Sequence, residues 1–175
     1  MSTSKPCHRP EIRLRTAEIR DVTSILELET ACFIRTEETF NRRQVCGLVV
    51  NPRATVILAE SKGHVVGWAA GLLRRHRHYY SGRLYALAVH PDMQGKRIGN
   101  KLIGRIFREL AARGARRIFL EVYTGNQKAI HLYRKFGFAD QEYLADYYGP
   151  GHHGLRMMRP ATATHRQKEL INTKP

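Results

Sequence analysis

Cysteine is scarce in this chain of 175 residues, which contains only Cys7, Cys32 and Cys46. Their odd number and wide spacing exclude a disulfide framework and do not fit the paired spacing of a zinc site. Cys32 lies on the apolar side of a predicted helix, and we expect it to pack in the core rather than to act as a nucleophile.

Long hydrophobic runs are also missing. No apolar stretch approaches the roughly 18 residues that a membrane-spanning helix needs. The first ten residues contain no apolar stretch of the kind found in signal peptides. We therefore expect a cytoplasmic protein that has no membrane partner.

Acidic residues are few: the chain has 15 Asp and Glu against 30 Lys and Arg, a net charge of +15 and a pI ≈ 10.3. Such a surface attracts nucleic acid, acidic proteins or phosphate-rich cofactors. Most of the charge is spread along the chain, but residues 74–78 form the cluster Arg-Arg-His-Arg-His. Two interpretations of this cluster stay open, a solvated loop and an electrostatic lip around an anionic ligand. Because no sequence motif of an RNA-binding module is present, we do not expect a specific nucleic-acid partner.

Apolar residues, by contrast, are present in sufficient number for one domain. They make up 42% of the chain, and the length also suits a single core. We place the domain at residues 11–160 and expect residues 1–10 and 161–175 to be flexible termini, because they carry little apolar pattern. Nothing in the sequence distinguishes a monomer from a homodimer.

Hydrophobic periodicity divides the domain into strands and helices. The strongest signal follows Gly95, where apolar residues recur at helical spacing opposite basic residues. Gly114 is expected to end this helix, and Asn126 to cap a further helix that Gly137 ends. The predicted strands are residues 11–16, 55–59, 65–73, 83–89, 117–122, 141–144 and 155–158; the other predicted helices are residues 19–33 and 41–50; the predicted loops include residues 74–81 and 146–154. This order predicts a mixed sheet with helices on its faces.

The segment from Val89 to Gly99 joins a predicted strand to the strongest helix. A tight loop before a helix N-terminus exposes backbone N–H groups at the positive end of the helix dipole, which favours an anion. Gly95 and Gly99 lack side chains that would block a close approach, and Lys96 and Arg97 add positive charge. Taken alone, this pattern also fits simple turn chemistry. It is neither a P-loop nor a dinucleotide fingerprint.

A second block follows one helix later, with Glu121, Asn126, Ala129 and Tyr133 ahead of Gly137-Phe138. Together the two blocks resemble motifs A and B of the GCN5-related N-acetyltransferase superfamily. In the first motif, Gln/Arg-x-x-Gly-x-Gly/Ala, the outer positions match Gln94 and Gly99, whereas Arg97 replaces the middle glycine. The resemblance extends over residues 12–158.

Within the superfamily, the chain is most similar to RimI-type N-terminal acetyltransferases. The similarity rests on Leu-Glu-Val before Asn126 and on Asp146-Tyr-Tyr-Gly149; in such enzymes the paired tyrosines help to hold a peptide N-terminus. The sequence departs after Gly149, where it lacks two acidic residues frequent in that family and has His152 and His153. Two adjacent histidines without a third spaced ligand do not predict a metal site, and the implied reaction needs no metal.

The resemblance implies an α/β fold with a mixed, mostly antiparallel seven-stranded sheet, flanked by four helices and splayed between strands 4 and 5. It implies acetyl-CoA as cofactor and a primary amine as acceptor. The implied cofactor-binding residues are Leu87, Ala88, Val89, Gln94, Gly95, Lys96, Arg97, Ile98, Gly99, Asn100, Asn126, Ala129 and Tyr133. The implied substrate-binding residues are Phe33, Tyr85, Glu121, Tyr147 and Tyr148.

The resemblance also assigns the catalytic roles: Glu121 is the expected base, acting through water, and Tyr133 the expected acid. A terminal amine has a pKa of about 8, so a modest base suffices, and the leaving thiolate needs a proton. The structural alternatives are a hydrogen-bonded strand glutamate and a core tyrosine, and for Tyr147 and Tyr148 a role in hairpin packing.

Three functions follow as hypotheses. The first is acetylation of a protein or peptide, above all at its N-terminal α-amine, and the second is acetylation of a small amine such as an amino acid, polyamine or antibiotic. The third is a basic nucleic-acid-binding module on the same fold. Because Gln94, Asn126 and Tyr133 are all retained, the third is the weakest.

Overall fold

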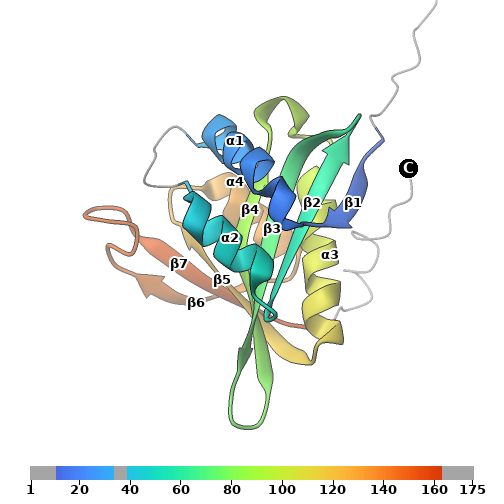
Figure 1. Ribbon diagram of the computed structural model, residues 1–175. Coiled ribbons are helices and arrows are strands. Elements are labelled where there is room, and N and C mark those ends of the chain that lie inside the picture. The colour runs from blue at the N-terminus through green and yellow to red at the C-terminus, as the bar shows by residue number, and fades with distance from the viewer. Residues whose placement is uncertain (1–10, 34–38, 163–175) are drawn as a thin grey trace, which may run out of the picture.

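The computed structural model describes residues 11–33 and 39–162, in which seven strands form one sheet of order β1-β2-β3-β4-β5-β7-β6 (Figure 1). Neighbouring strands are antiparallel, except that β4 and β5 run parallel. The strands are β1 Arg13–Thr16, β2 Ala54–Ser61, β3 His64–Arg75, β4 Tyr80–Val89, β5 Ala115–Tyr123, β6 Ala139–Leu144 and β7 Gly154–Pro160. The helices are α1 Val22–Cys32, α2 Arg42–Val50, α3 Ile98–Ala112 and α4 Gln127–Lys135, with short 3-10 turns at Ile19–Asp21 and Pro91–Met93.

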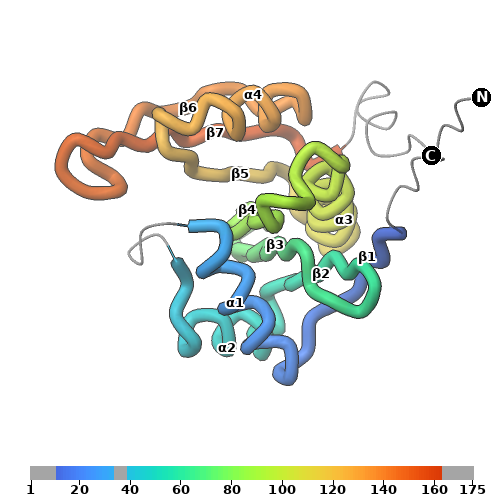
Figure 2. The backbone as a smooth tube through the Cα atoms, turned by 90° about the horizontal axis from the view of Figure 1, so that it is seen from above, coloured from blue at the N-terminus to red at the C-terminus, as the bar shows by residue number. Residues whose placement is uncertain are grey.

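The helices lie in two layers, with α1 and α2 on one face of the sheet and α3 and α4 on the other (Figure 2). One side of α3 faces the sheet with apolar residues at every fourth position, which are almost fully buried: Ile98, Leu102, Ile106 and Leu110. On the opposite face, α1 and α2 pack on β2, β3 and β4 around the buried Trp68. Two apolar cores therefore hold the sheet from both sides.

Local chemistry fixes where the helices begin and end. The side chains of Asn41 and Asn126 accept hydrogen bonds from backbone N–H groups in the first turns of α2 and α4. Gly114 and Gly137 follow α3 and α4 with φ of 88° and 83°, a conformation that suits glycine. The cap at Asn126 and the helix ends at Gly114 and Gly137 were expected from the sequence and are confirmed, whereas the cap at Asn41 was not predicted.

Strands β4 and β5 separate part-way along their length. They pair only from Tyr80 to Arg83 on β4, whose partners on β5 end at Phe119. Just beyond that point the β3–β4 register shifts, so that Tyr85 is an extra residue in β4. A β-bulge bends its strand and increases the local twist, and here it accompanies the end of pairing with β5. The remaining halves of β4 and β5 form a V.

The predicted element order, the mixed sheet and the splay are confirmed. The predicted loop over residues 74–81 is confirmed only at residues 76–79, because β3 continues to Arg75 and β4 begins at Tyr80. The residues of this segment are polar because solvent surrounds them, although their backbone is paired as a hairpin. No helix in the described ranges is long and apolar enough to cross a membrane.

The predicted flexible termini fall largely outside the described residues, which begin at residue 11 and end at residue 162. Within the described part, Ala161 packs in the core beneath α3 and α4. Cys32 and Cys46 are partly buried against the core under α1 and α2, as expected for Cys32, and Cys7 lies outside the described residues.

Candidate active site

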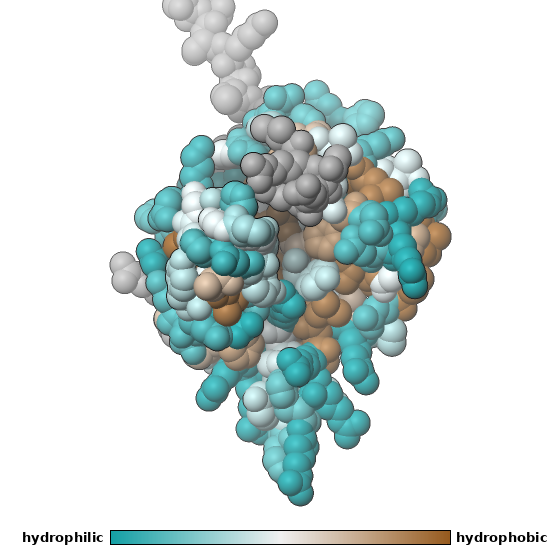
Figure 3. All heavy atoms as spheres, turned by 90° about the vertical axis from the view of Figure 1, so that its left-hand side faces the viewer, coloured by the Kyte–Doolittle hydropathy of each residue, from teal (hydrophilic) through white to brown (hydrophobic). Residues whose placement is uncertain are grey.

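The V between β4 and β5 is a groove of about 600 Å³. Figure 3 faces this open side, where hydrophobic residues line a hollow. The sequence-predicted residues that line the groove are Phe33, Tyr85, Leu87, Glu121, Asn126, Ala129, Tyr133 and Tyr148. The structure therefore brings together residues from α1, β4, β5, α4 and the β6–β7 loop.

The other predicted cofactor residues lie where β4 ends and α3 begins. The first backbone hydrogen bond of α3 joins Lys101 N–H to Arg97 C=O. The N–H groups of Ile98, Gly99 and Asn100 therefore have no partner within the helix, at the positive end of its dipole. A Cβ added to Gly99 would meet no atom closer than 3.9 Å, so internal packing does not require glycine there. The open space and the N–H groups suit a pyrophosphate.

Arg97 occupies the position where the motif usually has glycine. Its φ is 60° and that of Gly95 is 76°, so both residues adopt the left-handed conformation. Arg97 therefore keeps the backbone shape that a glycine would provide, at a cost of about 1–2 kcal/mol in strain. Gln94 supports the loop from the inside, because its Nε2 donates to the Val89 carbonyl at 3.2 Å.

The unpaired edges of β4 and β5 supply the next part of the groove. From Leu84 to Ala88, β4 pairs with no strand on the β5 side within the described residues, so its backbone groups can pair with an extended ligand, whereas the Val89 carbonyl already accepts from Gln94. Asn126 stands beside this edge, but its Oδ1 already accepts from Ala129 N–H at 3.0 Å. Its amide NH₂ group remains available as a hydrogen-bond donor.

Tyr133 projects from α4 into the floor of the groove. Its side chain is part of the core beneath α3 and α4, with 9% exposure, and its ring contacts Phe138 edge-on at 6.0 Å between centroids. Burial raises the pKa of the Tyr133 hydroxyl, so the group stays protonated near neutral pH and is available as a donor. Tyr133 is thus both a core residue and a groove residue, and its expected role as the acid stays a prediction.

Glu121 is held between two arginines. Its Oε1 accepts from Arg156 Nε at 3.0 Å, and its Oε2 lies 2.7 Å from Arg83 Nη2. Its side chain is 7% exposed, and Oε2 receives no well-aligned hydrogen bond from the described residues. Oε2 is therefore a buried acceptor that is ion-paired with Arg83 but has no aligned hydrogen-bond donor in the described residues.

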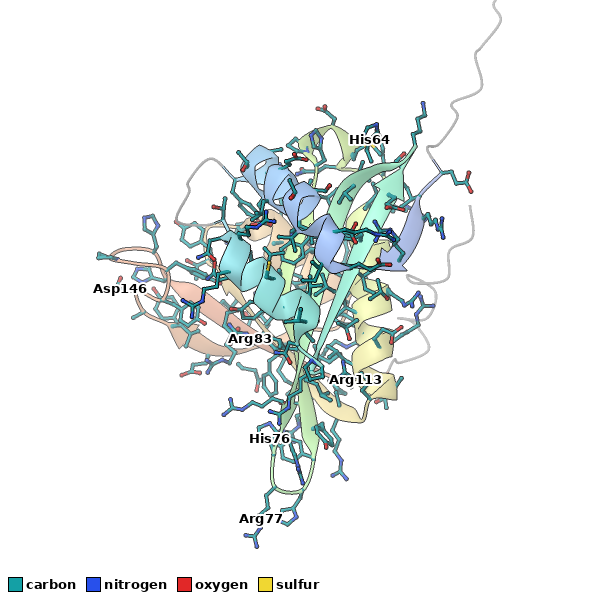
Figure 4. All side chains as sticks on the ribbon, viewed as in Figure 1. His64, His76, Arg77, Arg83, Arg113 and Asp146 are labelled. Atoms are coloured by element: carbon teal, nitrogen blue, oxygen red, sulfur yellow. The ribbon has the colours of Figure 1, made fainter. Side chains whose placement is uncertain are left out.

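These charges continue across the sheet. Arg156 lies directly opposite Glu121 on β7 and also pairs with Glu142 on β6, so positive and negative side chains alternate from β4 to β6. The hydrogen bond to Glu121 raises the pKa of Arg156. Figure 4 shows Arg83 near the middle of the sheet, above the hairpin that carries His76 and Arg77.

Aromatic residues surround the half of the groove next to Glu121. Phe40 packs on Tyr85 at 5.6 Å, and Tyr148 stands edge-on to both Tyr147 and Tyr123. Burial, assisted by Tyr147 and Glu121, raises the pKa of Tyr148 to about 12. Tyr147 does not line the groove itself; its hydroxyl accepts from Arg83 Nη2 at 3.2 Å.

Comparison with known proteins places this geometry in a family. The sequence profile described as "Acetyltransferase (GNAT) family" matches residues 22–138, which is more than half of the chain and includes both motifs. The chain belongs to the GNAT acetyltransferase family. An acetyltransferase of Pectobacterium atrosepticum is 39% identical over 82 residues, which cover 47% of this chain and 55% of that protein. The match thus spans little more than half the length of this curated relative.

Solved GNAT structures share the fold at low sequence identity. The ribosomal-protein-S18-alanine N-acetyltransferase of Escherichia coli superposes with a TM-score of 0.75 at 20% identity, covering 88% of this chain and 96% of the other. A putative acetyltransferase of Salmonella typhimurium, solved with its cofactor acetyl-CoA, has a TM-score of 0.72 at 20% identity, with coverage of 88% and 96%. These similarities support the fold of this GNAT chain and no finer assignment.

The sequence analysis of this GNAT chain did not identify Phe40 and His152 as groove residues, nor Arg83 and Arg156 as the ion-pair partners of Glu121. Arg83 and Arg156 interrupt apolar strand patterns, which was a usable signal, but only the strand register shows that both reach Glu121. His152 and His153 are loop residues as expected, yet they differ: His153 Nδ1 accepts from Asp146 N–H, whereas His152 lines the groove beside Tyr123.

Proposed function

We propose that this GNAT chain transfers the acetyl group of acetyl-CoA to a primary amine, with the N-terminal α-amine of a protein or peptide as the first candidate. The observation that carries the proposal is the continuous groove between β4 and β5. It has the unpaired N–H groups of α3 near one end, Tyr133 in its floor and Glu121 within an aromatic half. An anionic cofactor and an amine can thus reach the same part of the groove from different sides.

The thioester of acetyl-CoA supplies the activated acetyl group. In the proposed mechanism, the N-terminus of α3 holds the pyrophosphate and the free edge of β4 aligns the extended arm. Glu121 removes a proton from the amine through a water molecule, and the two arginines keep the carboxylate oriented. Tyr133 is the proposed acid for the departing sulfur, and its raised pKa keeps the proton on the hydroxyl until negative charge develops on that sulfur.

The aromatic half of the groove favours a peptide end over a compact polyamine. Phe33, Phe40, Tyr85 and Tyr148 offer flat, apolar walls, and the protonated Tyr148 hydroxyl offers a hydrogen-bond donor for a backbone carbonyl. The resemblance of the Tyr147-Tyr148 segment to that of RimI-type enzymes supports the same choice. Acetylation of a small amine remains the alternative that the experiment must separate.

Two measurements test the proposal. Acetyl-CoA at about 100 times its dissociation constant should stabilise the fold by about 2.7 kcal/mol, seen as a rise in Tm. Mass spectrometry should then detect acetyl transfer to peptides with free α-amines, and not to the same peptides with blocked N-termini. An unchanged Tm would contradict the proposed acetyl-CoA site. Transfer only to a panel of free amino acids and polyamines would contradict the proposed peptide acceptor.

A further inference from the structure

The β3–β4 hairpin extends beyond the rest of the sheet. Strand β2 begins at Ala54, opposite Leu72, so residues 73–79 have no neighbouring strand on that side. Figure 1 shows the hairpin leaving the body of the molecule, and Figure 3 shows its hydrophilic tip. We call residues 74–80, together with Arg116 and Arg117 at the adjacent start of β5, the basic arm.

The arginines of the basic arm have no acidic partners within residues 11–33 and 39–162. Ion pairs in the described residues involve Arg15, Arg20, Arg83, Arg105, Arg134 and Arg156, all of them outside the arm. Arg74, Arg75, Arg77, Arg116 and Arg117 are all exposed, and residues 61–91 of the sequence contain no Asp or Glu. The local field of the arm is therefore uncompensated.

The cofactor does not account for this charge. The arm and the α3 N-terminus lie at opposite ends of β4, from Tyr80 to Val89, which at about 3.3 Å per residue are roughly 30 Å apart. This is several times the Debye length of about 8 Å at physiological ionic strength. The charge of residues 74–78 therefore does not serve phosphates bound at the α3 N-terminus, and an anionic ligand of this cluster has to be another molecule.

The arm also presents flat rings. Tyr79 stacks on His76 with centroids 4.3 Å apart and an interplanar angle of 12°, and His76 is fixed by a 2.8 Å hydrogen bond to Ser81. Tyr79 and Tyr80 are each 38% exposed. Exposed rings beside guanidinium groups bind unpaired bases by stacking and phosphates by charge, a combination typical of single-stranded nucleic-acid sites.

We propose that the basic arm binds single-stranded nucleic acid. The arm has no exposed Leu, Ile, Phe or Trp side chain, so it lacks the apolar core of a protein interface and the apolar wedge of a membrane anchor. Stacking on Tyr79 and charge from Arg74, Arg75 and Arg77 supply the affinity. Since the arm is remote from the α3 N-terminus, binding does not require acetyl-CoA.

Fluorescence anisotropy of the full chain with labelled rU₁₂ and dT₁₂ tests this. The triple variant Arg74→Gln/Arg75→Gln/Arg77→Gln should weaken binding at least tenfold and reduce the slope of log K against log salt by about two, since each strand phosphate contact contributes about 0.7. The matched control is Arg13→Gln/Arg43→Gln/Arg108→Gln, which removes three exposed arginines without ion pairs elsewhere. It should lose less than about threefold.

A second variant separates stacking from charge. Tyr79→Ser should weaken binding about tenfold while leaving the salt slope unchanged, because stacking releases no counterions. The two oligomers then show whether RNA or DNA is preferred. A retained Tm rise with acetyl-CoA shows that each variant is folded.

Three results would overturn the proposal. The first is that neither oligomer binds, and the second is that the arm and control triple variants lose equal affinity. The third is that Tyr79→Ser binds the oligomers as tightly as wild type and that heparin displaces them equally from both proteins. The last would indicate a general polyanion site, such as one for an acidic protein. None of these outcomes bears on acetyl transfer.

Discussion

The groove has one half proposed for the cofactor and one half proposed for the acceptor, and the two halves consist of different kinds of chemical group. The cofactor half consists mainly of backbone: the N–H groups that begin α3, the free edge of β4 and a loop in the left-handed conformation at Gly95 and Arg97. The acceptor half consists of side chains from separate parts of the chain, among them Phe33, Phe40, Tyr85, Tyr148 and His152. Backbone geometry tolerates sequence change, whereas a side-chain surface changes with each substitution. The difference explains how one fold can keep a cofactor and vary its acceptor.

Glu121 and Tyr133 stand where the two halves meet, so substitutions there should show the sharpest separation of binding from chemistry. The Tyr133→Phe variant keeps the ring and its contact with Phe138. We expect kcat to fall about 10²-fold, at the low end for a positioned acid, because a thiol is a fairly good leaving group. Acetyl-CoA affinity, measured by calorimetry, should change little.

A wild-type kcat in Tyr133→Phe would contradict the acid assignment and leave Tyr133 as a packing residue. Phe138→Leu is a useful control, because it disturbs the same core contact without removing a hydroxyl. If that control loses as much kcat as Tyr133→Phe, packing explains the effect.

The second prediction concerns the acceptor half. Glu121→Gln removes the base and leaves Arg83 and Arg156 without the carboxylate between them. We expect kcat to fall about tenfold at pH 7. Because the free amine predominates above its pKa of about 8, the defect should shrink as the pH rises past that value. A pH profile of kcat for variant and wild type checks this.

A defect in Glu121→Gln that stays constant with pH would assign the carboxylate to orientation rather than to proton transfer. Glu142→Gln is the matched comparison, since it removes the other carboxylate bound to Arg156 while leaving the groove intact. We expect this control to keep kcat within about twofold, as is usual for an exposed ion pair.

The same contrast explains what the sequence predicted. The structure of the half proposed for the cofactor was predictable, because its residues are nearly contiguous from Val89 to Asn100; its role in binding stays a prediction. The acceptor half was only partly predictable. The ion pair between Arg156 and Glu121 depends on the β5–β7 register, and His152 reaches the groove through the fold of a loop. Short-range periodicity in the sequence encodes neither feature. The hairpin at residues 74–80 was missed because both of its sides face solvent, so no apolar alternation marked it.

A third prediction examines how the acceptor half is supported. Glu29 on α1 is buried; its Oε1 accepts from Trp68 Nε1 at 2.7 Å and its Oε2 from Phe40 N–H at 3.1 Å, which fixes one aromatic wall. Burial raises the pKa of Glu29. Its stabilising contribution is therefore complete below the unfolded value of about 4.3 and is lost as the pH rises through the folded pKa.

Urea unfolding of wild type and Glu29→Gln between pH 4 and pH 7 measures this contribution. The free energy of unfolding of wild type, relative to that of the variant, should fall as the pH rises across this range. A difference that stays constant, or that grows with pH, would show that the carboxylate is ionised at no cost in the folded protein.

The smallest expected effect lies in the cofactor half, where backbone shape should matter more than side-chain identity. Arg97 has φ of 60°, so Arg97→Gly relieves about 1–2 kcal/mol of left-handed strain, which the greater freedom of glycine in the unfolded chain offsets by about 0.5–1 kcal/mol. Its stability should thus stay within about 1.5 kcal/mol of wild type. Its acetyl-CoA affinity should stay within about fivefold, because one exposed cation is lost while the N–H groups of α3 remain. Arg97→Val removes the same charge but places a β-branched residue in this conformation, where it is a steric outlier. We expect Arg97→Val to lose both more stability and more affinity than Arg97→Gly, as measured by urea unfolding and calorimetry. Equal affinities in the two variants, both far below wild type, would instead show that the guanidinium itself binds the cofactor and that the cofactor half also depends on a side chain.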